Sequence, residues 1–143
     1  METIKRTFSI SCLALAVGLA LGWAFDAQAQ DSVNAEQVIN FIGFQQLEDA
    51  SRIYIRTDVT PSYRVERPDE QTIEVVFNAA DVAVNRLLLP IDTRFFDSPI
   101  TDITPVRIEG ASQNTIRVTV RLRTATEYFT SLKDSTVFLT FKR

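Results

Sequence analysis

The chain has 143 residues, a net charge of −3 at pH 7 and no histidine. Its only cysteine, Cys12, lies in an apolar N-terminal stretch, so a chain without that stretch contains neither thiol nor imidazole. Cysteine nucleophiles, histidine-based triads and thiolate or imidazole metal sites are thus excluded from the rest of the chain. We expect no cofactor, no metal and no enzymatic activity. The slightly acidic balance also gives no reason to expect nucleic acid, which favours a basic footprint.

Residues 1–29 have the three parts of a signal peptide. Lys5 and Arg6 supply a positive region, Phe8 to Phe25 forms an apolar stretch without charge, and Ala27-Gln28-Ala29 places small residues at a signal-peptidase site. An uncleaved anchor is the alternative, because the apolar stretch is just long enough to cross a bilayer. We expect cleavage after Ala29, export to the periplasm and no membrane span in the mature chain, which would have about 114 residues.

From Val38 onward the chain shows the period-two alternation of β-strands. The clearest segment is 115–123, in which Ile116, Val118, Val120 and Leu122 point one way and Arg117, Thr119, Arg121 and Arg123 the other. Segments 51–57, 72–78 and 136–141 alternate in the same manner, and no convincing helical period follows Gln30. The pattern predicts an all-β domain over 38–143, preceded by a short extension, 30–37.

The pattern also occurs twice, which indicates two halves, 38–78 and 100–143, joined by a connection, 79–99. The matched positions are Ile42 and Phe44 with Val106 and Ile108, Ile53 and Ile55 with Ile116 and Val118, Tyr63 with Tyr128, and Ile73, Val75 and Phe77 with Val137, Leu139 and Phe141. Each half has one apolar face that it cannot bury alone. We therefore expect a sandwich of two similar four-stranded sheets formed by an internal duplication, with the connection carrying the chain from one sheet to the other.

The order of these segments resembles the AMIN domain, a family found in exported N-acetylmuramyl-L-alanine amidases and in type IV pilus secretins. The resemblance runs from Val38 to Phe141 through VINFIGF, SRIYIRTD, PSYRVE, TIEVVFNAA, an LDT-like stretch at Leu89–Thr93, SPITDITPVRI, NTIRVTVRL, EYFTSLKD and TVFLTFK. It implies a β-sandwich that binds peptidoglycan and localises the protein that carries it. The amidase or secretin domains that usually accompany this family are not in this sequence.

The candidate ligand-binding residues lie on the polar sides of two predicted strands: Arg52, Tyr54, Arg56, Arg117, Arg121 and Arg123. Arginine forks match carboxylates in a bidentate way, and peptidoglycan stem peptides present carboxylates beside sugars on which a tyrosine can stack. The alternative is a solvated surface whose arginines pair with Glu66, Glu74 or Glu109 across strands. If each half forms one sheet, the two groups of arginines lie on opposite outer faces.

Two functions therefore stay open. One is a non-catalytic cell-envelope module that binds peptidoglycan through an exposed polar sheet face. The other is an accessory module that binds envelope assembly proteins of a pilus or secretion system, through a strand edge or through Phe41, Phe95, Phe96 and Phe138. These phenylalanines either cap the core or form a patch for a partner.

Overall fold

The computed structural model describes residues 36–143, so the predicted signal peptide and its cleavage site lie outside the described residues. The elements are β1 Gln37–Gln46, β2 Ala50–Thr57, β3 Tyr63–Asp69, β4 Thr72–Phe77, β5 Ala80–Val82, the 3-10 turn η1 Asn85–Leu88, β6 Ile91–Asp92, β7 Ile100–Ile108, β8 Thr115–Leu122, β9 Tyr128–Lys133 and β10 Thr136–Lys142. Within the described part, no helix has the length and apolar character needed to cross a membrane.

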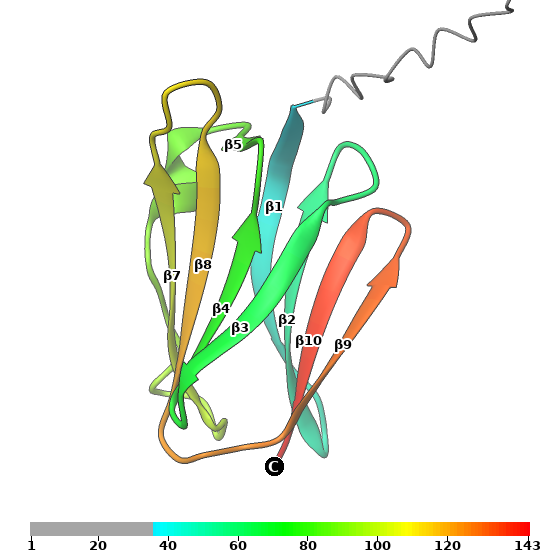
Figure 1. Cartoon of the computed structure of the whole chain (residues 1–143). Helices are drawn as coiled ribbons and strands as arrows, with labels where there is room; N and C mark the ends of the chain where they lie inside the picture. Colours follow the sequence, from blue (N-terminus) through cyan, green and yellow to red (C-terminus); the bar gives the residue numbers. More distant parts are fainter. Residues whose placement is uncertain (1–35) are drawn as a thin grey trace, which may run out of the picture. The chain divides into compact units, whose positions relative to one another are not determined.

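The strands form two five-stranded sheets, and the predicted all-β sandwich is confirmed. Sheet A has the order β5-β1-β2-β10-β9, and sheet B has the order β3-β4-β8-β7-β6. Figure 1 shows β1, β2, β10 and β9 in one layer and β3, β4, β8 and β7 in the other. Each sheet has five strands rather than the expected four because β5 and β6, both from the connection, each add a short edge strand.

The expectation that each half forms its own sheet is wrong. Strands β1 and β2 of the first half share sheet A with β9 and β10 of the second, while β3 and β4 share sheet B with β7 and β8. Each half thus contributes one hairpin to each sheet, and the β2–β10 and β4–β8 pairs join the halves. The apolar faces are buried against each other in either arrangement, so the local pattern does not distinguish them.

The duplication is visible in the strand pairing itself. The β1–β2 and β7–β8 pairs correspond, as do β3–β4 and β9–β10, and β7 carries a register shift at Ile100/Asp102 that matches the one in β1 at Ile39/Phe41. Tyr63 lies opposite Phe77 just as Tyr128 lies opposite Phe141. The matches of Tyr63 with Tyr128 and of Phe77 with Phe141 therefore agree with those predicted from the sequence.

The four other matches, between β1 and β7 and between β2 and β8, are wrong by register, as Ile53 and Ile42 show. Ile53 lies opposite Leu139, and its counterpart opposite Val75 is Val118 rather than Ile116. Ile42 lies opposite Ile55, and its counterpart opposite Val120 is Ile103; Val106, the predicted match, is 45% exposed. The Ile53 match is off by two residues, which keeps the side chain on its face, so alternation does not detect it. The Ile42 match is off by three residues, so Val106 lies on the outer face while Ile42 lies on the core side.

The core lies between the two sheets and consists of the predicted inward residues. The side chains with no exposed surface include Ile53, Ile55, Ile73, Val75, Phe77, Ile116, Val118, Val120, Val137, Leu139 and Phe141. Ile39, Ile100 and Ile103 of β1 and β7, together with Ala80 of β5, are equally buried. This rigid centre fixes the outward direction of the alternate residues, which form the two outer faces.

Candidate binding faces

The structure divides the predicted site residues between opposite faces of the sandwich. Arg52, Tyr54 and Arg56 alternate with the buried residues of β2 and lie on the outer face of sheet A. Arg117 and Arg121 alternate with the buried residues of β8 and lie on the outer face of sheet B. Arg123 follows the end of β8. The six residues therefore do not form one site, although strands are exchanged between the halves.

A row of aromatic rings crosses the outer face of sheet A. The Phe41 and Tyr54 rings stack, with centroids 5.3 Å apart and planes 8° from parallel. Gly43 lies opposite Tyr54 on β1, and Phe138 lies opposite Tyr54 on β10. A Cβ at Gly43 would lie 2.6 Å from both Phe41 Cε1 and Tyr54 Cζ, so both rings occupy the space over this glycine. The missing side chain lets the stacked pair lie close to the sheet.

Cationic groups lie over the phenylalanines of the same face. The Arg52 guanidinium carbon is 5.5 Å from the Phe138 ring centroid, and that of Arg56 is 5.9 Å from Phe41. Lys142 Nζ is 5.1 Å from the centroid of Phe129 on the edge strand β9. Contacts of this kind hold the cations near the rings while leaving their N–H groups open to solvent. We call Phe41, Arg52, Tyr54, Arg56, Phe129, Phe138 and Lys142 the aromatic-cationic face.

The aromatic-cationic face has an excess of positive charge. The four long strands of sheet A contain no aspartate or glutamate, whereas they carry Arg52, Arg56, Lys133 and Lys142. Within residues 36–143, neither Arg52 nor Arg56 forms an ion pair; Arg52 Nε donates only to Thr140 Oγ1, at 3.2 Å. Two guanidinium groups are thus available to an external anion beside flat aromatic surface.

The outer face of sheet B is different because its charges are balanced. Arg117 Nε is 3.7 Å from Glu74 Oε2, and Arg64 pairs with Glu66. The pairing of Arg117 with Glu74 is the predicted solvated-surface arrangement. Arg121 lies opposite Asp102 in the strand register, in an open depression of about 690 Å³ that also holds Asp69, Glu70 and Arg94. Arg121 forms no ion pair within residues 36–143, but Asp69, Glu70 and Asp102 line the same depression, so acidic groups surround its charge.

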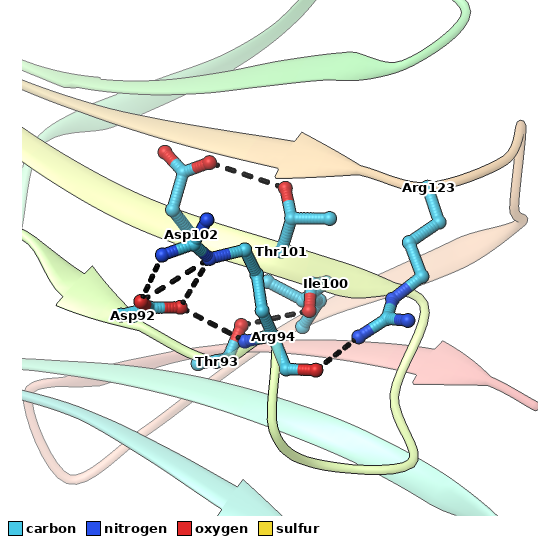
Figure 2. Close-up of polar contacts among 7 residues, drawn as sticks. All are labelled: Asp92, Thr93, Arg94, Ile100, Thr101, Asp102 and Arg123. Carbon is cyan, nitrogen blue, oxygen red and sulfur yellow. Dashed lines mark hydrogen bonds and ion pairs between the residues drawn. The ribbon is translucent and has the colours of Figure 1, made fainter.

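Arg123 is used by the protein itself, in fixing the turn between β6 and β7. Figure 2 shows its guanidinium donating to the Arg94 carbonyl oxygen, while the buried Thr93 Oγ1 donates to the Ile100 carbonyl at 2.7 Å. The Arg94 fork closes on Asp92, with Nη2 2.7 Å from Oδ2 and Nε 3.0 Å from Oδ1. These bonds hold the loop that carries Phe95, which is 90% exposed.

The ion pair in this turn predicts a pH-dependent stability. The hydrogen bonds from the Arg94 side chain and its backbone N–H lower the pKa of Asp92 to about 2. A lowered pKa in the folded state gives a contribution that is complete above the ordinary pKa and is lost as the pH falls through the folded value. We expect Asp92→Asn to lower the free energy of unfolding at pH 7, and the difference from wild type to disappear between about pH 4 and pH 2.

Urea melts at several pH values would measure this effect, with Glu109→Gln as a control outside the turn. If the difference in free energy of unfolding between Asp92→Asn and wild type stayed constant down to pH 2, the charge of the Asp92 carboxylate would contribute nothing to stability.

The structure adds Gly43, Phe129 and Lys142 to the residues found by sequence reasoning. Phe129 shares the parity of Ser131 and Lys133 on β9, so alternation placed it on a polar side where an aromatic residue is unusual. Gly43 interrupts a strand, which often marks a close approach by another group. Phe138 and Phe41, considered as possible core caps, lie on the outer face, whereas Phe96 packs against Phe44 with centroids 5.1 Å apart.

No protein-family model matches the chain, and no curated protein matches it either. The resemblance to AMIN domains thus stays a prediction from the residues quoted for it.

Proposed function

We propose that this chain is an exported, non-catalytic module of the cell envelope that binds peptidoglycan through the aromatic-cationic face of sheet A. The observation that carries the proposal is the stacked Phe41–Tyr54 pair, flanked by Arg52 and Arg56. Neither arginine has an ion-pair partner among the residues that the structure describes, and their strands hold no carboxylate. The leader-like residues 1–29 and the AMIN-like segment order support the periplasm as the place of action and peptidoglycan as the ligand.

The chemistry of this face is complementary to both parts of peptidoglycan. The apolar side of a sugar ring can stack on Tyr54 or Phe41, and the carboxylates of the stem peptide can accept two N–H groups from one guanidinium. Each exposed contact contributes only about 1 kcal/mol or less. Useful affinity therefore requires several contacts at once on a repeating polymer.

The same face lacks the groups for hydrolysis. Its polar side chains are arginines, lysines, threonines, a serine, a tyrosine and the amides of β1, and no carboxylate or imidazole is present on these strands to act as a general base. We therefore propose binding without catalysis.

Retention on purified sacculi tests the proposal. The folded mature chain should sediment with sacculi at low salt, and the bound fraction should fall as salt screens the exposed arginines. Glycan strands stripped of their stem peptides should retain less protein than intact sacculi, because they lack the carboxylates. Recovery of the whole sample in the supernatant at low salt would contradict the proposal.

Gly43→Ala is expected to weaken this retention without unfolding the protein. The new Cβ would meet the far ends of the Phe41 and Tyr54 rings at 2.6 Å, and both rings can swing outward into solvent. The stacked surface is then lost, while the free energy of unfolding changes by less than about 1 kcal/mol. Thr119→Ala, at the position of sheet B that corresponds to Tyr54, is the matched control and should bind as wild type does. Unchanged retention by Gly43→Ala would remove the flat aromatic pair from the proposed site.

A protein-binding role is the second candidate, and the β6–β7 loop favours it. Phe95 is 90% exposed at the tip of a loop that Arg123 and Thr93 hold in place. An exposed aromatic side chain on a fixed loop is typical of a contact with another protein. Loss of envelope partners on Phe95→Ala, with sacculus binding intact, would support this role.

A further inference from the structure

The sandwich has four edge strands, and three of them are protected against pairing with another chain. Strand β5 has three residues and β6 has two, which is too short for a stable added strand. Strand β3 carries Arg64, Glu66 and Arg67, contains Pro68, and has a register shift between Glu66 and Asp69. Charges, proline and irregular pairing are the usual features that prevent edge-to-edge association.

Strand β9 lacks these features. It has six residues, Tyr128–Lys133, with no proline or glycine and a single charge, and its pairing with β10 is regular. Figure 1 shows it at the end of sheet A with β10 on one side only. Phe129 is 53% exposed, and Leu132 is 44% exposed although its parity places it on the core side of the sheet. The unpaired backbone of β9 is thus accompanied by uncovered apolar side chains.

We infer that the β9 edge pairs with β9 of a second copy of this chain, in antiparallel orientation, so that sheet A continues through both protomers. An antiparallel pair of identical strands is closed by a two-fold axis, and the interface is then saturated by two copies. The backbone groups supply the hydrogen bonds, and the side chains on each face select the register.

The side chains favour the register in which the axis passes through Thr130. In that register Tyr128 lies opposite the partner's Leu132, which covers the exposed leucine. Glu127 lies opposite the partner's Lys133, so two symmetric pairs of opposite charge flank the centre. An axis through Ser131 instead places Tyr128 opposite the partner's Asp134 and leaves Glu127 opposite no cation of the partner. The complementarity of Lys133 at the end of β9 with Glu127 just before its start is the reason to assign a second copy, rather than a foreign peptide, to this edge.

The dimer has a consequence for binding that rests on the proposed function. Phe129 and Lys133 lie on the outer side of β9, so pairing across this edge places two aromatic-cationic faces side by side on one continuous surface. Two such faces would act together on a repeating polymer. Dimerisation itself does not depend on the identity of the ligand.

Sedimentation equilibrium of the mature chain tests the inference without any ligand. We expect a concentration-dependent shift to twice the protomer mass. Glu127→Lys places like charges opposite each other twice and should weaken association at least about threefold. The double variant Glu127→Lys with Lys133→Glu restores both pairs and should recover the wild-type constant. A protein that stays monomeric at several hundred micromolar, or a Glu127→Lys variant that dimerises as wild type does, would overturn the inference.

Cross-linking tests the register directly. In a chain that begins at Gln30 and so holds no native cysteine, Thr130→Cys places two thiols across the axis at a Cα separation of about 4.5–5.5 Å, which a disulfide can span. We expect a covalent dimer on mild oxidation. Val65→Cys, at the corresponding position of the protected edge β3, is the matched control and should remain monomeric. Equal cross-linking of both variants, or capture of a foreign peptide by a monomeric Thr130→Cys protein, would contradict self-pairing. Sacculus retention measured on the same samples separates this result from the proposed function, because a monomer can still bind and a dimer can fail to bind.

Discussion

Truncating Phe77 or Phe141 to alanine will lower the free energy of unfolding by about 3–5 kcal/mol in each case. Both side chains have no exposed surface, and each packs against a tyrosine on the neighbouring strand, with ring centroids 5.9 Å apart for Tyr63–Phe77 and 5.8 Å for Tyr128–Phe141. The two phenylalanines are equivalent in the duplicated pairing, so their losses should agree to within about 1 kcal/mol. Urea melts of the two variants measure this.

Phe138→Ala is the matched control for these core variants. Phe138 belongs to the same strand as Phe141, but it lies on the outer face, where Arg52 covers its ring. Its truncation should cost less than about 1.5 kcal/mol, since it leaves no cavity in the core. Equal losses for Phe138→Ala and Phe141→Ala would contradict the assignment of inner and outer residues in β10.

The facing of most strands could be predicted from the sequence because burial follows a period of two, but that of β7 could not, because Val106, matched with the buried Ile42, is exposed. Ile116, Val118 and Val120 alternate with polar residues, and the structure buries all three. The register could not be predicted, because a slip of two residues changes no facing. The match of Ile53 with Ile116 is such a slip, and only the pairing with Leu139 and Val75 reveals it.

The local sequence pattern also could not predict which strands belong to which sheet. Neither Ala80–Val82 nor Ile91–Asp92 alternates long enough to indicate a strand, and both owe their conformation to the neighbours β1 and β7. Exchange of hairpins between the sheets leaves the apolar faces equally buried. The candidate site depended on this assignment, because it decides which aromatic residues of β1, β9 and β10 lie beside Arg52 and Arg56.

Replacing both Arg52 and Arg56 by alanine should reduce retention on sacculi about tenfold at moderate salt, while Arg117→Ala with Arg121→Ala leaves retention unchanged. The first pair has no acidic partner within residues 36–143 and lies beside the stacked Phe41 and Tyr54 rings. Two exposed charge-assisted contacts of up to about 1 kcal/mol each account for a loss of this size. The second pair lies on the charge-balanced face, where Glu74 already neutralises Arg117.

The two double variants are matched in charge, in strand type and in position, because β2 and β8 correspond in the duplicated pairing. The free energy of unfolding of both variants should lie within about 1 kcal/mol of that of the wild type, since all four side chains point away from the core. If retention came only from non-specific attraction between a cationic protein surface and an anionic wall, both variants would lose retention equally, because each loses two positive charges. A loss confined to Arg52→Ala with Arg56→Ala therefore assigns binding to sheet A. Equal losses of retention would mean that the arginines act only through their general charge. If neither variant lost retention, the binding site would have to be sought at Phe95 and at the strand edges.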